Sequence, residues 1–348
     1  MWRLSLRDLQ WRRRRFTIAV AATALVFAMT LLFAGVNASF HNETRRIVGS
    51  FHADRWLVAE GASGPFTTAS VIPASAAQRV AQLPGVMRAD PVVIFHSAVR
   101  VGTLRDVNLI GYRLGGLGSP AVRDGRVPAG PGEVVVDSEL GLGVGEQVTV
   151  SGRTLRVVGV AEGVTYYFGQ PTLFVPIAEA QAIAFGRQPL AMTIVTRGVP
   201  ATIPDGLQAM SGPEVRTDLE RPLASSTQTI GLLDALLLVV AAGIIGSILY
   251  LSALERVRDF AVLKATGASN RALLAGLALQ ALLLAAAAAL LAVLLANLLA
   301  PVFPFNIEIP TSAYLRLAIL ALVVGLVATL AGLRQAVGVD PALAFGGR

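Results

Sequence analysis

The chain has 348 residues, of which 54% are hydrophobic and only 15% are charged. Soluble domains are about one-quarter charged, so this composition excludes an ordinary soluble protein and indicates an integral membrane protein. The formal net charge of +7 could by itself suggest binding to nucleic acid. The chain has no cysteine, which excludes disulfides and metal sites built on thiolates.

The excess positive charge lies in segments that flank apolar runs. Residues 37–228 contain 16 Arg against 16 Asp and Glu, so their net charge is zero. Six Arg precede the first apolar run, and four more basic residues lie within residues 252–271. This distribution follows the positive-inside rule and argues against a nucleic-acid partner.

Four apolar segments are long enough to cross the hydrocarbon core of a bilayer, which takes about 20 residues. The positive-inside rule places both termini in the cytoplasm. The predicted fold is an α-helical membrane protein with four transmembrane helices and an α+β extracytoplasmic domain inserted between helices 1 and 2. In chain order, the predicted segments are a cytoplasmic amphipathic helix (1–15), transmembrane helix 1 (16–36), the extracytoplasmic domain (37–229), transmembrane helix 2 (230–251), a cytoplasmic coupling segment (252–271), transmembrane helix 3 (272–300), an external loop (301–312), transmembrane helix 4 (313–333) and a cytoplasmic tail (334–348).

The first apolar run could instead be a cleavable signal peptide, because Val36-Asn37-Ala38 faintly resembles a cleavage site. Its apolar region exceeds the roughly 7–15 residues of a signal peptide, and three more apolar runs follow. An uncleaved membrane anchor is therefore the favoured interpretation.

The segment before this run has the pattern of a helix with one apolar and one basic face. Such a helix is expected to lie at the inner lipid surface, where Arg side chains meet anionic headgroups. A solvated basic tail is the alternative interpretation. The predicted membrane-interface residues are Trp2, Leu6, Leu9, Arg12 and Arg13.

Few polar residues enter the apolar runs. Asp234 and Arg316 lie close to the outer ends of their predicted helices, from which their side chains can reach water. Gln280 is expected to form a hydrogen bond across a helix interface, and small residues allow helices to approach closely. The predicted helix-packing residues are Gly243, Gly246, Gln280, Ala328 and Gly332.

The predicted extracytoplasmic domain contains short β-rich runs separated by Gly and Pro. The clearest feature is a hairpin whose turn is Ser151-Gly152. Ser75 is the expected N-cap of a helix over 75–83, and a second helix is predicted over 177–185. Strands are predicted at 55–59, 92–101, 106–112, 133–136, 147–150, 153–160, 172–175 and 191–195. A mixed α+β domain follows.

No catalytic or metal-binding pattern is found in this domain. His41, His52 and His96 lack metal-ligand spacing, and no Gly-x-Ser-x-Gly sequence occurs. The run Gly141-Leu142-Gly143-Val144-Gly145 is followed by another strand, so it is interpreted as a turn rather than a phosphate-binding loop. The cluster Tyr166-Tyr167-Phe168 could contact a ligand or lipid, but core packing or loop anchoring is favoured. The sequence predicts no enzyme.

The charged segment at 252–271 is the best indication of function. It contains Lys264, the only Lys in the chain, in the sequence Ala-Val-Leu-Lys-Ala-Thr, without the glycines of a phosphate-binding loop. Any energy for mechanical work must therefore come from another subunit. The segment could dock to that subunit, or it could be a solvated loop that merely follows the positive-inside rule. Docking is the favoured interpretation.

The segment Glu255-Arg256-x-Arg258-Asp259-Phe260-Ala261-Val262-Leu263-Lys264-Ala265-x-Gly267-Ala268-Ser269 resembles the signature of FtsX-like/MacB-like ABC transporter permeases. Asp340-Pro341-Ala342-x-Ala344 is similar to the C-terminal ending of that family. Leu83-Pro84-Gly85-Val86 and Gly132-Glu133-Val134-Val135-Val136 are also typical of the family. Asp259 stands where Glu is commoner, and Gln280 stands where relatives often have Glu.

The resemblance implies a stand-alone, type VII mechanotransmission permease in a bacterial plasma membrane. Its implied partners are a separate ABC ATPase subunit, a second copy or close paralogue of the permease, the lipid bilayer and an extracytoplasmic protein. The chain itself is expected to hold no cofactor, because ATP and Mg²⁺ belong to the ATPase. The residues implied to contact that ATPase are Glu255, Arg256, Arg258, Asp259, Phe260, Leu263, Lys264 and Gly267.

Export or extraction of a hydrophobic or amphipathic substrate is the leading functional prediction. The alternative is an FtsX-like signalling module, in which the same motion activates a cell-wall hydrolase or a sensor. An importer of glutamine or another amino acid is disfavoured, because importers generally use a separate binding protein and lack so large an external insert.

Overall fold

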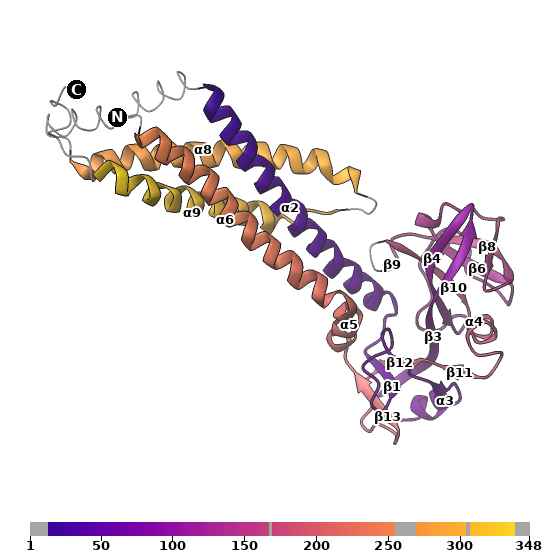
Figure 1. Cartoon of the computed structure of the whole chain (residues 1–348). Helices are drawn as coiled ribbons and strands as arrows, with labels where there is room; N and C mark the ends of the chain where they lie inside the picture. The colour runs from indigo at the N-terminus through magenta and orange to yellow at the C-terminus, as the bar shows by residue number, and fades with distance from the viewer. Residues whose placement is uncertain (1–12, 167–168, 255–268, 304–306, 338–348) are drawn as a thin grey trace, which may run out of the picture. The chain divides into compact units, whose positions relative to one another are not determined.

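The computed structural model describes residues 13–166, 169–254, 269–303 and 307–337. The chain divides into two compact units (Figure 1). The α/β domain comprises Phe40–Ser225, and the helix unit comprises Met1–Ser39 together with Ser226–Arg348.

The long helices are α2 (Arg13–Ser50), α6 (Ala224–Leu254), α8 (Asn270–Leu299) and α9 (Thr311–Val337), and a short 3-10 helix, η3 (Ala300–Val302), follows α8. Three described stretches are long and apolar enough to span a membrane: Phe16–Ser50, Gly212–Ile248 and Ala278–Val302. In α9 the described apolar stretch, Thr311–Val327, is shorter. The structure thus supports three of the four predicted spans, and the fourth stays a prediction.

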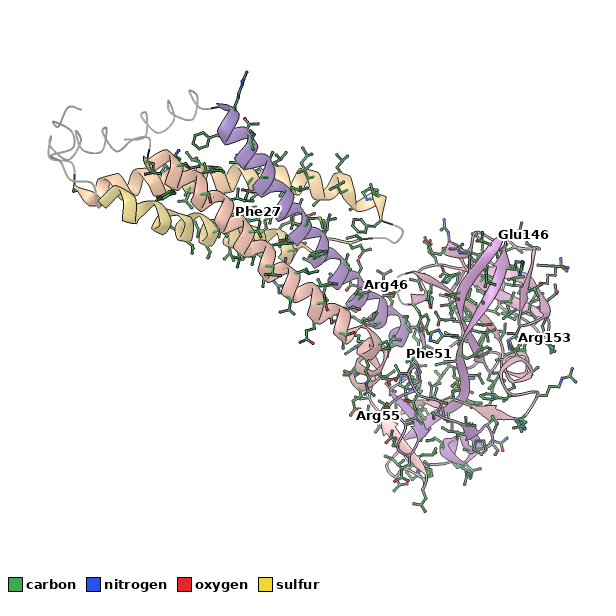
Figure 2. The ribbon with its side chains drawn as sticks, viewed as in Figure 1. Phe27, Arg46, Phe51, Arg55, Glu146 and Arg153 are labelled. Carbon is green, nitrogen blue, oxygen red and sulfur yellow. The ribbon has the colours of Figure 1, made fainter. Side chains whose placement is uncertain are left out.

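Alanine forms the contact face of α8 in the helix unit. Buried alanines recur along this helix at helical spacing, and α8 packs against α9. Side chains this small let two helix backbones approach closely, which favours association inside a bilayer. The buried alanines of α8 are Ala281, Ala285, Ala288, Ala292 and Ala296. In α2 the largest fully buried side chain before residue 40 is Phe27 (Figure 2).

The α/β domain is built on an eleven-stranded sheet and a separate two-stranded one. The main path runs β13-β1-β12-β3-β4-β10-β6-β8-β5, with β7 and β9 beside it, while β11 pairs with β2. The strands are β1 (Arg55–Ala59), β2 (Ile72–Pro73), β3 (Val86–Val101), β4 (Thr103–Tyr112), β5 (Val122–Gly125), β6 (Glu133–Asp137), β7 (Gln147–Val150), β8 (Arg153–Ala161), β9 (Thr165–Tyr166), β10 (Gln170–Pro176), β11 (Leu190–Ala191), β12 (Thr193–Gly198) and β13 (Leu207–Met210).

The long strand β3 joins two parts of the domain. Its residues 86–92 pair with β12, and residues 93–101 pair with β4. The strands β3, β4, β10, β6, β8 and β7 form a closed ring, because β7 pairs with both β8 and β3. All of these strands contribute to one apolar cluster, which includes Val99, Val107 and Leu109 and therefore lies inside the ring.

A second apolar cluster lies on the other face of the same strands. Strand side chains alternate between faces, so Ile110 and Tyr112 of β4 point away from the interior that Leu109 fills. This second cluster also contains Phe51 (Figure 2) and Trp56, whose ring centroids are 4.6 Å apart in an edge-to-face arrangement. Chain segments that enter and leave the domain meet in this core.

The strand predictions are confirmed, with differences at several ends. β1 and β7 have the predicted bounds, and the predicted hairpin turn has Ser151 and Gly152 at φ values of 47° and 79°. Such left-handed conformations suit a two-residue hairpin. β3 starts six residues before its predicted start at residue 92. The predicted strand over 191–195 is divided between β11 and β12.

Three helices complete the domain: α3 (Ala76–Ala81), α4 (Ile177–Ala184) and α5 (Gly212–Glu220). Ser75 stands at the predicted N-cap position of α3, but it has helical φ and ψ and its side chain forms no capping hydrogen bond. Sequence reasoning missed α5, although Ser211 and Glu214 form a capping box at its start. Glu214 Oε2 accepts hydrogen bonds from the backbone N–H and hydroxyl of Ser211, both at 2.7 Å.

Candidate functional site: the base of the α/β domain and the helix contacts

The predicted coupling residues, from Glu255 to Gly267, lie outside the described residues, as do Trp2, Leu6, Leu9 and Arg12. Arg13 is the first residue of α2. The helices on either side of the coupling segment are described, since α6 ends at Leu254 and α8 begins at Asn270. The role of the segment stays a prediction.

Gln280 is buried in α8, with only 4% of its surface exposed. Its side-chain Nε2 has no hydrogen-bond acceptor within the part of the chain that the structure describes. A buried amide without a partner is costly, particularly in an apolar environment. Gln280 Nε2 therefore donates no hydrogen bond across a helix interface among these residues, and the predicted packing role of Gln280 stays a prediction.

The other predicted packing residues have different surroundings. A methyl group added at Gly243 would meet no atom within 4 Å, so no described segment packs closely there, whereas Gly246 is buried. The close contact is made instead by Gly325 of α9, whose added Cβ would lie 3.5 Å from the backbone of Ala281 in α8. Ala328 and Gly332 lie further along α9, where only the backbone is described.

Residues 307–309, between α8 and α9, contact residues 35–39 of α2 within the helix unit. A Cβ added at Gly35 would lie 2.6 Å from Ile307 Cγ2 and 3.1 Å from Ile309 Cγ1. The Glu308 backbone N–H also donates a hydrogen bond to Ser39 Oγ at 3.2 Å. Gly35 thus provides space for two isoleucine side chains, a requirement that the sequence pattern did not reveal.

Glu220 connects the first and last helical segments of the α/β domain. It ends α5, while His41 and Thr44 lie on the part of α2 that belongs to the domain. Glu220 Oε1 accepts a hydrogen bond from Thr44 Oγ1 at 2.8 Å and lies 3.0 Å from His41 Nδ1. This polar contact joins residues 176 and 179 positions apart.

Apolar packing reinforces the same junction. Ile47 and Val48 of α2 belong to one core cluster with Val215 and Leu219 of α5. The segment that enters the domain and the segment that leaves it are therefore packed against a common core. We call this junction of α2 residues 40–50 with α5 the base of the domain.

Asp218 attaches a loop to the base. Its carboxylate is fully buried and accepts hydrogen bonds from the backbone N–H groups of Phe66, at 3.0 Å, and Thr67, at 3.4 Å. The hydroxyl of Thr67 donates a third. Gly64 is required beside this network, because a Cβ there would lie 2.1 Å from Asp218 Cγ.

Other buried carboxylates of the domain have structural partners. Asp90 Oδ2 lies 2.6 Å from Arg88 Nε and accepts a hydrogen bond from the Leu117 N–H at 2.9 Å. Glu179 Oε1 lies 2.6 Å from Nε of Arg153 (Figure 2). No group of three or more potential metal ligands occurs within the described ranges. Asp90 and Glu179 are thus each paired with an arginine.

The remaining candidate motifs have structural roles. The run from Gly141 to Gly145 is a turn, and its Gly143 N–H donates to Glu146 Oε2 at 2.8 Å (Figure 2). Tyr166 is fully buried, and its ring lies 5.8 Å from that of Phe66, which confirms core packing at this position. The neighbouring residues 167–168 lie outside the described ranges.

An α/β domain inserted after the first of several apolar helices defines a multi-helix membrane protein with one large non-membrane insert. Residues 17–206 match the family described as MacB-like periplasmic core domain, and residues 232–341 match FtsX-like permease C-terminal. The chain belongs to this FtsX-like/MacB-like family of ABC transporter permeases. The resemblance predicted from the sequence is confirmed.

Similar proteins occur in mycobacteria. An uncharacterized ABC transporter permease of Mycobacterium bovis is 44% identical over 344 residues, which cover 99% of each chain. Two uncharacterized ABC transporter permeases of Mycobacterium tuberculosis strain H37Rv are 44% and 43% identical over the same length. These relatives support the classification of the whole chain as a permease.

Two solved structures resemble part of the chain. The extracellular domain of the ABC-type transporter YknZ from Gram-positive bacteria is 13% identical, with a TM-score of 0.35, covering 46% of this chain and all of that one. The periplasmic region of MacB from Actinobacillus actinomycetemcomitans is 14% identical, with a TM-score of 0.36, covering 50% of this chain and 95% of that one.

Proposed function

We propose that the chain is a permease subunit that couples ATP hydrolysis by a separate ATPase subunit to movement of the α/β domain. The movement would export or extract a hydrophobic or amphipathic substrate. The observation that carries this proposal is the match to ABC transporter permeases over 99% of the chain, together with a single Lys that lies in no phosphate-binding loop. ATP and Mg²⁺ would bind to the ATPase.

The proposed assembly has four transmembrane helices per permease, with both termini in the cytoplasm and the α/β domain outside. Two permeases, identical or closely related, would pair above two ATPase subunits. The charge distribution supports this orientation, because the basic residues outside the domain flank the apolar runs on one side. A protein outside the membrane is a further partner in this proposal.

The base of the domain supports transmission of movement. Glu220 and the apolar residues around Val215 hold α5 against α2 within the domain. Displacement of α2 or of α5 would therefore exert force on the same apolar core. Packed interiors respond to such displacement by switching between discrete arrangements rather than by bending freely. A shift of the helical segments would therefore be expected to move the domain as a body.

The coupling segment has suitable chemistry for docking. Arg258 and Lys264 would meet acidic groups of the ATPase, while Phe260 and Leu263 would enter an apolar groove. A short helix that combines apolar anchors with charges at its rim is a recurrent way for one protein to bind another.

Reversing two charges tests this docking. The double variant Arg258→Glu, Lys264→Glu is expected to lower permease-stimulated ATP hydrolysis at least about tenfold, because like charges at an interface cost several kcal/mol. The measurement is ATP turnover and copurification of the two subunits from membranes. The matched control is Arg79→Glu, Arg100→Glu, which makes the same charge change at exposed positions of the α/β domain. Turnover and copurification that remain unchanged in the first variant would refute docking through this segment.

A signalling function is the second candidate, supported by the FtsX-like match of residues 232–341. The same ATP-driven motion would then activate an external hydrolase or sensor without transport. Capture of proteins and lipids on the full-length chain separates the two functions. A specifically bound hydrolase favours signalling, and a specifically bound lipid or amphiphile favours transport.

A further inference from the structure

An open hollow of about 530 Å³ lies in the α/β domain on the side where β3 and β4 meet the loop after β1. Its polar lining includes His96 of β3, Asp106 of β4 and Gln170 of β10. Its apolar lining includes Phe66 together with Pro222 and Leu223 of η2 (Arg221–Leu223). Residues from five separate chain segments thus converge on one concave surface.

The polar residues of the hollow lie on the same face of the sheet as a group of apolar residues. His96 lies opposite Asn108 on the antiparallel neighbour, two residues along from Ile94 and Ile110, which pair in the same register. Asn108 is buried, and its Nδ2 lies 3.5 Å from Gln170 Oε1. Because side chains alternate along a strand, His96 and Asn108 share the face of Ile94 and Ile110. This face therefore changes from apolar to polar at the hollow.

The charge of the hollow is negative near neutral pH. Asp106 is the one acidic side chain among the lining residues, and neither Lys nor Arg lines the hollow within the described ranges. Burial lowers the pKa of His96, against the opposing effects of its hydrogen bond with Asn108 and the nearby Asp106. The imidazole lines the hollow, and the protein around it partly excludes water, which favours the neutral form of the ring over the charged form.

We propose that this hollow binds a small amphipathic organic cation. The charged head would lie against Asp106 and His96, and the apolar body would cover Phe66, Pro222 and Leu223. The volume is in the range of about 300–1,000 Å³ typical of small-molecule sites, which combine apolar walls with a few polar groups. This inference rests on the proposed function, because it names the class of amphipathic substrate that the domain would receive.

The test uses a matched pair of probes on the full-length chain in phosphatidylcholine nanodiscs. The probes are 2-(2-naphthyl)ethylammonium and the neutral 2-(2-naphthyl)ethanol, detected by saturation-transfer NMR with empty nanodiscs subtracted. The cation is expected to bind more tightly than the alcohol. Asp106→Asn is expected to weaken binding of the cation about threefold to fivefold, as for the loss of an exposed charge pair, and Asp106→Glu to restore it.

Asp124→Asn is the matched control, since Asp124 is an exposed carboxylate of β5 that does not line the hollow. Equal weakening by Asp106→Asn and Asp124→Asn, or equal binding of the two probes, would overturn the proposal. ATP turnover with the separate ATPase is measured on the same nanodiscs. If the probes do not bind as expected but ATP turnover is normal, the binding site in the hollow is rejected and the proposed coupling function is not. If the probes bind as expected but ATP turnover is absent, the coupling function is rejected and the binding site is not.

Discussion

Replacement of Trp56 by alanine is expected to lower the free energy of unfolding of the α/β domain by about 3 to 5 kcal/mol. Trp56 has no exposed surface, and its ring lies 4.6 Å from that of Phe51 and 5.7 Å from that of Phe66. Truncation would leave a cavity at the centre of the cluster that also contains α2 and α5 residues. It would also remove two aromatic pairs, each worth about 0.5–1.5 kcal/mol beyond burial.

The effect of Trp56→Ala can be measured as the urea midpoint for proteolysis of the full-length protein in detergent. Trp56→Phe is expected to cost less, because the indole Nε1 has no hydrogen-bond partner among the described residues and an aromatic ring is retained. Met87→Ala, a truncation at a side chain that is 76% exposed, is the control. A midpoint for Trp56→Ala equal to that of Met87→Ala would contradict the central position assigned to Trp56.

Replacement of Asp218 by alanine is expected to cost about 3 kcal/mol of domain stability. The variant removes the acceptor of three hydrogen bonds, which come from the backbone N–H groups of Phe66 and Thr67 and from the Thr67 hydroxyl. Phe66 is partly buried and Thr67 is exposed, so water can replace part of the loss. A hydrogen bond to a charged group contributes about 1.5–3 kcal/mol. Asp218→Asn keeps the shape and one acceptor oxygen, so about half of that loss is expected.

The same urea midpoint tests the Asp218 prediction, with hydrogen exchange at Phe66 and Thr67 as a local readout. Faster exchange at these two amides is expected in Asp218→Ala. Asp124→Ala removes a carboxylate that is 69% exposed and serves as the control. If Asp218→Ala unfolds at the same urea concentration as this control, the hydrogen-bond network does not stabilise the base of the domain.

Strands that alternate clearly between apolar and polar residues could be placed from the sequence, whereas elements with buried charges could not. β3 extends back to Val86, through Arg88 and Asp90, which interrupt the apolar pattern. Asp90 is nevertheless buried, because Arg88 and the Leu117 N–H provide its partners. Those partners are supplied by the tertiary fold, so local patterning alone gives the wrong start of the strand.

Helical segments at the base were missed for a similar reason. The extension of α2 beyond residue 36 carries Glu43, Arg45 and Arg46, so hydropathy ends the predicted span before the helix ends. In α5 few residues are apolar, and its burial depends on contacts of Val215 and Leu219 with α2. The Ser211–Glu214 capping box was the one local signal that could have located α5.

The family signature could be recognised from consecutive residues, but the contacts of the base and the hollow could not. The contact of His41 with Glu220 joins residues 179 positions apart. The hollow likewise brings Phe66, His96 and Leu223 together only after the sheet has formed. A single sequence does not show how such distant segments align with each other. Composition alone also does not show which distant residues come into contact.

Docking of residues 252–271 to a separate ATPase is tested most directly by photo-cross-linking from position 260 in the full-length permease. Phe260 is replaced by benzoylphenylalanine, and the permease is irradiated in membranes that also contain the ATPase. Leu104, a side chain of the α/β domain that is 69% exposed, is replaced in the control. We expect a covalent permease–ATPase product from position 260 and none from position 104. Absence of the product at position 260, or equal yields at both positions, would contradict docking through this segment.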